Sequence, residues 1–73
     1  MNMIEKRLMK YIPKKIQPHV IHLYEQCPRT SDSPAVYALG IDVDGEYVAG
    51  VCDGVKEIRW AANYMMENKE YNF

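Results

Sequence analysis

The 73-residue sequence has little cysteine and no long apolar run, and each shortage excludes a class of protein. Two cysteines, Cys27 and Cys52, are too few for the disulfide scaffold of a small secreted domain. The first ten residues carry scattered charges rather than an apolar stretch, so we expect neither a secretion signal nor a membrane span there. A reducing, cytoplasmic setting is therefore the default expectation.

The sequence also lacks internal repeats, low-complexity tracts and a strong net charge. Its length suits one small domain with a modest core, because a chain of this size buries only about 60% of its unfolded surface. The net charge of −1 is unevenly divided: residues 1–34 hold six Lys or Arg against three acids, and residues 35–73 hold three against seven. An imbalance of this size is typical of a charged binding surface and equally of ordinary solvated surfaces.

No group of residues has the pattern of a catalytic centre, because no nucleophile has a base and an orienting partner at suitable spacing. Four residues have zinc-ligating side chains: His19, His22, Cys27 and Cys52. The two histidines are three residues apart on an expected strand and so point to opposite faces, and the cysteines lack pair spacing. We therefore predict a protein with no enzymatic activity, no metal site and no cofactor.

The sequence contains a clear β-hairpin pattern. Apolar residues alternate with small or polar ones over residues 36–43, which is the period of two of a half-buried strand. A second strand is expected over residues 46–52. Between them, Asp44 and Gly45 form a strong hairpin signal, because both residue types tolerate positive φ.

This turn is compatible with two strand registers. A two-residue turn sets Ile41 opposite Val48, whereas a three-residue loop with a glycine bulge sets Ile41 opposite Tyr47. The second register gathers the apolar residues of both strands on one face. It also sets Asp42 opposite Glu46, which costs about 0.2–1 kcal/mol. Because that cost is smaller than the loss of a matched apolar face, we predict the bulged loop.

An amphipathic helix is expected over residues 54–68, with the Asp53 carboxylate capping its first turn. At about 100° per residue, its apolar side chains form one stripe that we predict to pack on the sheet. The stripe consists of Val55, Ile58, Ala62, Met65 and Met66.

Trp60 and Tyr64 fall on the opposite side of this helix, four residues apart, and so should contact each other. Two interpretations of this aromatic pair are open. The pair is exposed and binds a protein, or it is covered by the N-terminal helix or by the C-terminal Tyr71 and Phe73.

The N-terminal third has two further expected elements and a loop. Residues 2–12 have helical periodicity that ends at Pro13, and residues 19–25, after Pro18, are expected to form a strand. The Pro, Ser and Asp content of residues 27–34 indicates a loop. The basic side chains at this end include Lys6, Lys10, Lys14 and Lys15.

The order helix, strand, strand, strand, helix, together with the segment GVCDGVKEIRWAA at 50–62, resembles the double-stranded-RNA-binding domain. In that family a glycine-flanked third strand leads into a helix with three basic positions and an alanine pair. Lys56 and Arg59 match two of the basic positions, and Val55 departs from the third. The resemblance implies an α+β fold, α-β-β-β-α, with a three-stranded antiparallel sheet and both helices packed on one face.

Two functions from different classes follow. The first is a small non-enzymatic interaction module that binds a protein or self-associates as a homodimer through Trp60 and Tyr64, because Trp and Tyr are enriched at interface hot spots. The second, implied by the resemblance, is binding to the backbone of double-stranded RNA or DNA through Lys56, Arg59 and the four N-terminal lysines. The net charge of −1 opposes phosphate binding, so we predict the first. A module of this size would suit an accessory factor of a phage or mobile element.

Overall fold

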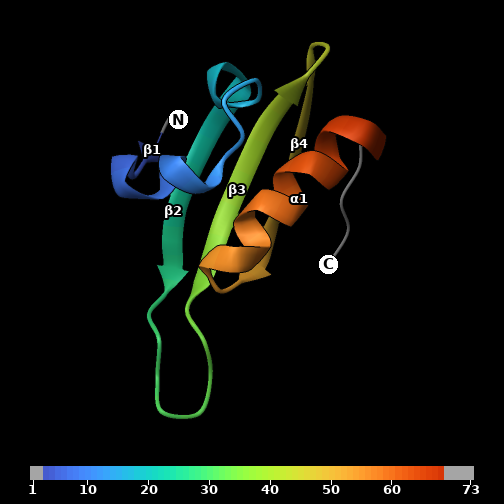
Figure 1. Cartoon of the computed structure of the whole chain (residues 1–73). Coiled ribbons are helices and arrows are strands. Elements are labelled where there is room, and N and C mark those ends of the chain that lie inside the picture. Colours follow the sequence, from blue (N-terminus) through green and yellow to red (C-terminus); the bar gives the residue numbers. More distant parts are fainter. Residues whose placement is uncertain (1–2, 69–73) are drawn as a thin grey trace.

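A computed structural model describes residues 3–68, and within them the fold is α+β. A four-stranded mixed sheet has the strand order β1-β2-β3-β4, and one main helix, α1, follows the last strand (Figure 1). Neighbouring strands are antiparallel except for β1, which pairs with β2 in parallel. The elements are β1 (Met3–Ile4), the 3₁₀ helices η1 (Lys6–Tyr11) and η2 (Gln17–His19), β2 (Val20–Cys27), β3 (Val36–Val43), β4 (Glu46–Asp53) and α1 (Val55–Asn68).

The N-terminal segment differs from the helix predicted over residues 2–12. β1 adds a fourth strand, with Ile4 opposite Leu23 of β2, and the six-residue helix that follows is 3₁₀ rather than α. The reason lies in the hydrogen bonds of Glu5. Its N–H donates to the Leu23 carbonyl at 2.8 Å, and its carboxylate accepts the Glu25 N–H at 2.8 Å. These bonds hold the residues before η1 in the sheet, so an α-helix cannot begin there.

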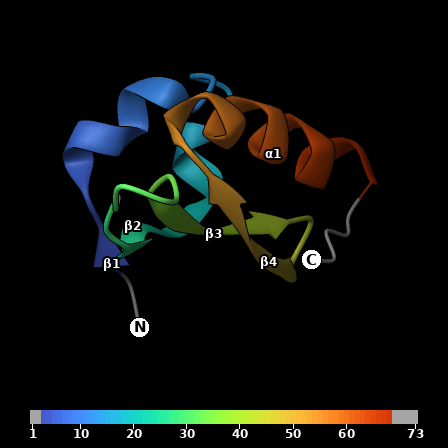
Figure 2. The same cartoon turned by 90° about the horizontal axis from the view of Figure 1, so that it is seen from below.

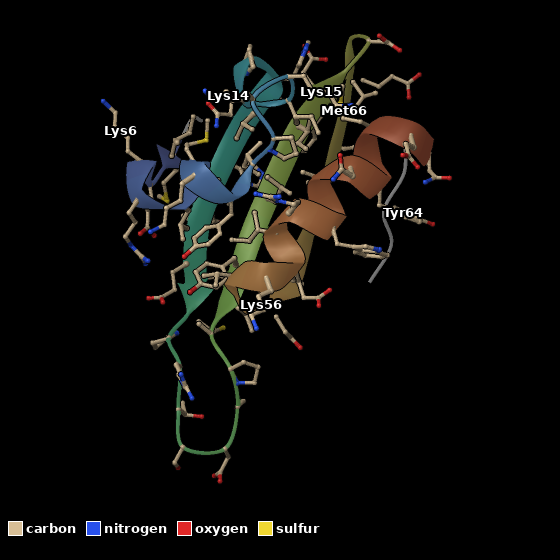
Figure 3. The ribbon with its side chains drawn as sticks, viewed as in Figure 1. Lys6, Lys14, Lys15, Lys56, Tyr64 and Met66 are labelled. Carbon is tan, nitrogen blue, oxygen red and sulfur yellow. The ribbon has the colours of Figure 1, made fainter. Side chains whose placement is uncertain are left out.

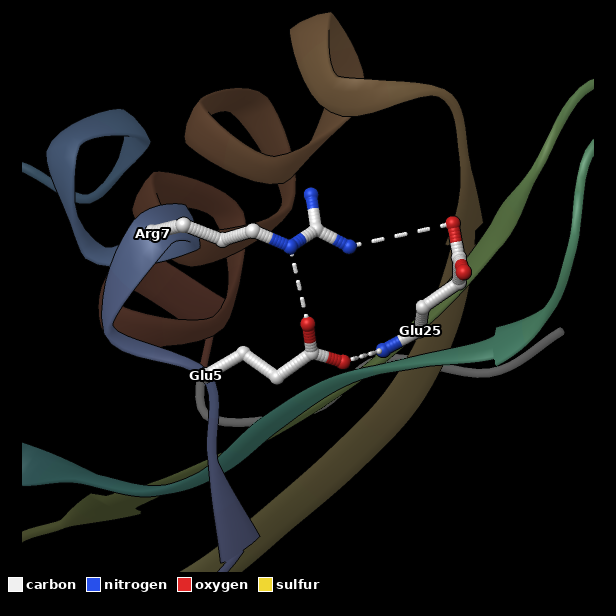
Figure 4. A network of polar contacts seen from close by, with 3 residues as sticks. All are labelled: Glu5, Arg7 and Glu25. Atoms are coloured by element: carbon white, nitrogen blue, oxygen red, sulfur yellow. Dashed lines mark hydrogen bonds and ion pairs between the residues drawn. The ribbon is translucent and has the colours of Figure 1, made fainter.

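An ion-pair network joins the same segment to β2. The Arg7 guanidinium lies 2.9 Å from the Glu5 carboxylate and 3.8 Å from the Glu25 carboxylate (Figure 4). The Arg7 side chain is more than half exposed, and water and salt screen exposed ion pairs so that they contribute little to stability. The network therefore orients the N-terminal segment more than it stabilises the fold.

The β3–β4 turn has the two-residue register, so the predicted bulged loop is wrong. Ile41 lies opposite Val48, and the ladder continues without a register shift. The two turn residues, Asp44 and Gly45, have φ of 54° and 87°, as a type I′ turn requires. The Asp42 carboxylate accepts the Gly45 N–H at 2.9 Å, and this side-chain hydrogen bond stabilises the turn. These local preferences outweigh the apolar matching on which the prediction was based.

The strand expected over residues 19–25 forms as β2, shifted towards its C-terminal end. It begins at Val20 because the residues around Pro18 form η2, and it continues to Cys27.

The start of the last helix also differs from the prediction. Gly54, with φ of 80°, lies between Asp53 and the first residue of α1. α1 therefore begins at Val55, one residue later than predicted, and the Gly54 backbone carbonyl accepts a first-turn N–H at 3.3 Å.

The core lies between the sheet and a helical layer. Figure 2 shows η1 and α1 over the same face of the sheet. The predicted apolar stripe of α1 is confirmed, because Ile58, Ala62 and Met65 are fully buried and pack in one cluster with Leu39 and Ile41. Three further residues of α1 complete this side of the helix: the buried Ala61, which the prediction omitted, and the partly buried Val55 and Met66.

The two thiols should differ sharply in reactivity. Cys27 is exposed, whereas Cys52 is buried and its S–H donates to the Tyr37 carbonyl at 3.8 Å. Burial, with smaller effects of the Glu57 and Asp53 charges, raises the pKa of the Cys52 thiol to about 11. Because the thiolate is the reactive form, we expect a thiol reagent to label one cysteine of the native protein at about pH 8, and both in denaturant. Rapid labelling of a native Cys27→Ser variant would contradict this arrangement.

Candidate interaction surface

The aromatic pair, Trp60 and Tyr64, lies on the exposed side of α1. Trp60 is 53% exposed and Tyr64 is 37% exposed. On the other side of the helix, Ile58, Ala62 and Met65 of the stripe are fully buried. The two rings stack with 5.2 Å between centroids and 26° between planes, the contact expected from their spacing. Offset stacking at this distance is attractive, so each ring restricts the other. The pair therefore forms an ordered aromatic surface beside the core rather than a part of it.

The N-terminal helix leaves Trp60 half exposed, which removes one of the two predicted covers. η1 contributes Leu8 to the core and contacts α1, yet the Trp60 ring remains 53% exposed. The other predicted cover, Tyr71 and Phe73, lies outside the described residues. Figure 3 shows Tyr64 on the side of α1 that faces away from η1 and β2. Because the strand order ends at β4, this is also the side of the β4 edge of the sheet.

The outer sheet face, opposite α1, carries a second aromatic cluster that the sequence analysis did not identify. His22 Nε2 and the Tyr47 hydroxyl lie 2.6 Å apart and bridge β2 to β4 across the central strand. The bridge passes over Gly40, where a Cβ would overlap both rings. The Tyr24 ring lies 5.7 Å from the His22 ring. Partial burial in this cluster lowers the pKa of His22, because it disfavours the charged imidazolium.

The basic residues predicted to bind nucleic acid lie at several separate places. All six are exposed, on η1, on the segment after it and on α1. Figure 3 shows Lys6 at one side of the helical layer, Lys14 and Lys15 near the top of the view, and Lys56 at the opposite end, where α1 begins. A continuous phosphate-binding groove needs basic side chains along one path, and this distribution does not provide one.

An open cavity of about 730 Å³ lies between the loop at 28–35 and the start of α1. Its charged lining residues have both signs: Arg29, Asp32, Asp53, Lys56 and Glu57. Mixed charge of this kind favours neither an anionic nor a cationic ligand. Lys56 therefore shares its surroundings with carboxylates, which weakens its attraction for a phosphate.

Within residues 3–68, no helix has the length and hydropathy needed to cross a membrane. The same residues hold no cluster of three or more His, Cys, Asp or Glu side chains suited to a metal ion. The stacking and exposure of the aromatic pair, and its position beside the β4 edge, define the candidate surface. No protein-family model, curated protein or solved structure matches the chain.

Proposed function

We propose that the protein is a non-enzymatic interaction module that binds a protein through the aromatic pair on α1. The observation that supports this most directly is a stacked, exposed pair on a helix whose opposite side already fills the core. Trp and Tyr are the residue types most enriched at interface hot spots. They supply a large contact area with few rotatable bonds, so little entropy is lost on binding.

The aromatic pair is too small to hold a complex alone. Trp60 at 53% and Tyr64 at 37% exposure leave roughly 200 Å² for a partner to cover. At about 25 cal/mol per Å² this corresponds to about 5 kcal/mol before any cost. Lost translational and rotational freedom costs about 4–15 kcal/mol. A partner must therefore also contact the surface around the pair.

A double substitution of the pair tests the proposal. Trp60→Ala with Tyr64→Ala should leave the fold intact, with a change below about 1 kcal/mol in the free energy of unfolding, because neither ring fills the core. Self-association or partner binding should be lost. Urea denaturation measures the first quantity, and sedimentation velocity with pull-down measures the second.

The matched control is Lys56→Ala with Arg59→Ala, which changes two exposed positions on the same helix and spares the aromatic pair. This control should associate as the native protein does. If the aromatic double variant instead loses several kcal/mol of stability, as core aromatic truncations do, the pair is core and the proposal fails.

The second candidate, binding to a nucleic-acid backbone, has weaker support because its basic residues are separated and Lys56 lies among carboxylates. We expect no mobility shift with double-stranded RNA, double-stranded DNA or single strands at about 50 mM salt. A shift that is abolished by Lys56→Glu with Arg59→Glu, and that weakens steeply with salt, would favour this function instead.

A further inference from the structure

β4 is an edge strand that lacks the usual protection against pairing. On one side it pairs with β3 over eight residues without a register shift, and no strand within residues 3–68 pairs with its other side. Its sequence, EYVAGVCD, contains no Pro, Lys or Arg. Natural edge strands are usually short, bulged, or marked by Pro or Lys, and the opposite edge, β1, has only two residues. The β4 edge is therefore suited to receive another strand.

The backbone groups at this edge follow from the turn. A two-residue turn makes Val43 and Glu46 a hydrogen-bonded pair, and such pairs alternate along an antiparallel ladder. Every second residue of β4, starting at Glu46, therefore bonds to β3. The residues between them direct both N–H and C=O away from β3: Tyr47, Ala49, Val51 and Asp53.

We propose that this edge pairs antiparallel with β4 of a second copy of the chain, about a twofold axis. The inference rests on the proposed function, because it names a second copy as the partner that also covers the aromatic pair. A twofold axis perpendicular to the sheet keeps both helices on one side. The joined sheet has eight strands and buries both unprotected edges.

The outward-facing groups select one register. With Gly50 opposite Gly50 of the second copy, Ala49 faces Val51 and Tyr47 faces Asp53, so every outward-facing residue is hydrogen-bonded. No two carboxylates are then directly opposite. Centring the pair on Ala49 instead leaves Asp53 without a partner. The first register is therefore the one we infer.

The same axis brings the two aromatic pairs together. α1 contacts both β3 and β4, and Tyr64 lies on the side of α1 that faces away from η1 (Figure 3). With strands about 4.8 Å apart, the two α1 helices would lie roughly 10 Å apart, near the usual distance of 8–10 Å between packed helices. The aromatic rings would fill the space between them. The strand edge thus supplies the additional contacts that the aromatic pair needs.

A proline at an outward-facing position tests the strand pairing. Ala49→Pro removes an N–H at the free edge and leaves the ladder to β3 intact. The matched control, Ala49→Ser, keeps that N–H. We expect the native protein and Ala49→Ser to sediment at twice the mass of the chain. We expect Ala49→Pro to bind itself at least 10-fold more weakly, with its native circular dichroism retained.

Cross-linking tests the register without a proline. In a Cys27→Ser background, an Ala49→Cys chain mixed with a Val51→Cys chain should form a disulfide-linked dimer under mild oxidation. Residues 49 and 51 of the two copies would then be about 5.5 Å apart between Cα atoms, within disulfide range. Either variant alone should cross-link several-fold less. Stronger cross-linking of Ala49→Cys with itself would overturn the proposed register.

The outcomes separate this inference from the proposed function. A native protein that stays monomeric up to about 1 mM overturns the β4 pairing, whereas capture of another protein by the aromatic pair can still be observed. If Trp60→Ala with Tyr64→Ala abolishes the dimer and Ala49→Pro does not, the proposed function stands and the strand pairing is wrong. If only Ala49→Pro abolishes it, the strand pairing stands and the aromatic proposal is wrong. A dimer that appears only after removal of residues 69–73 would identify that segment as the occupant of the edge and overturn the inference.

Discussion

A Leu39→Asp variant is expected to be unfolded without denaturant. Leu39 is fully buried at the middle of β3, opposite Leu23 of β2 and Gly50 of β4. A buried carboxylate without a partner costs several kcal/mol, and the lost packing of a core leucine adds about 2–5 kcal/mol. Small domains have about 5–15 kcal/mol of total stability, so the sum is sufficient to unfold this one. Far-ultraviolet circular dichroism and the dispersion of an NMR spectrum measure the outcome.

Two controls separate burial from charge. Leu39→Met conserves volume and should cost less than about 1.5 kcal/mol. Tyr47→Asp introduces the same carboxylate on the neighbouring strand, at a side chain that is 61% exposed, and should remain folded. A Leu39→Asp protein with a native spectrum would show that β3 does not form the centre of the core.

The second large effect is expected at Gly40, which lies beneath the His22–Tyr47 bridge. An added methyl group would overlap both rings, so the bridge must move or break. Overpacking costs about 1–3 kcal/mol, and loss of the hydrogen bond adds about 1 kcal/mol. We therefore expect Gly40→Ala to destabilise the fold by about 2–4 kcal/mol in urea denaturation.

A double-mutant cycle identifies the cause. In a His22→Ala background one of the two overlapping rings is absent, so Gly40→Ala should cost much less. Alanine also loses less backbone entropy than glycine on folding, which offsets about 0.5–1 kcal/mol of the remaining cost. A Gly40→Ala penalty that is equal in both backgrounds would show that the His22 ring is not responsible.

The elements of the C-terminal half follow from local patterns in the sequence. Alternation over residues 36–43 and the turn pair Asp44-Gly45 predict the hairpin, because strand periodicity and positive φ are properties of neighbouring residues. The stripe on α1 is predicted for the same reason, since side chains three and four apart share one face of a helix. The exposure of Trp60 and its contact with Tyr64 follow directly from that stripe.

The hairpin register illustrates where a sequence pattern is insufficient. Both registers are compatible with the alternation, and matching of apolar faces favoured the wrong one. That criterion assumes one apolar face and one polar face. The sheet instead has apolar or aromatic residues on both sides, with Ile41 and Val48 in the core and Tyr47 on the outer sheet face. The choice was made by the turn, through the Asp42 carboxylate and the Gly45 N–H.

Only the tertiary structure decides the features that depend on distant residues. Glu5 bonds to β2 residues about twenty positions away, which places β1 in the sheet and prevents the predicted helix from beginning at residue 2. His22 meets Tyr47 only because β2 and β4 lie on either side of β3. Likewise, no local pattern indicates that β4 is an edge strand or that Tyr64 lies on the same side. The sequence by itself therefore determined the segments that form β2, β3, β4 and α1, through short-range periodicity. Long-range hydrogen bonds and strand order decided the structure of the N-terminal segment and which surfaces the other elements expose.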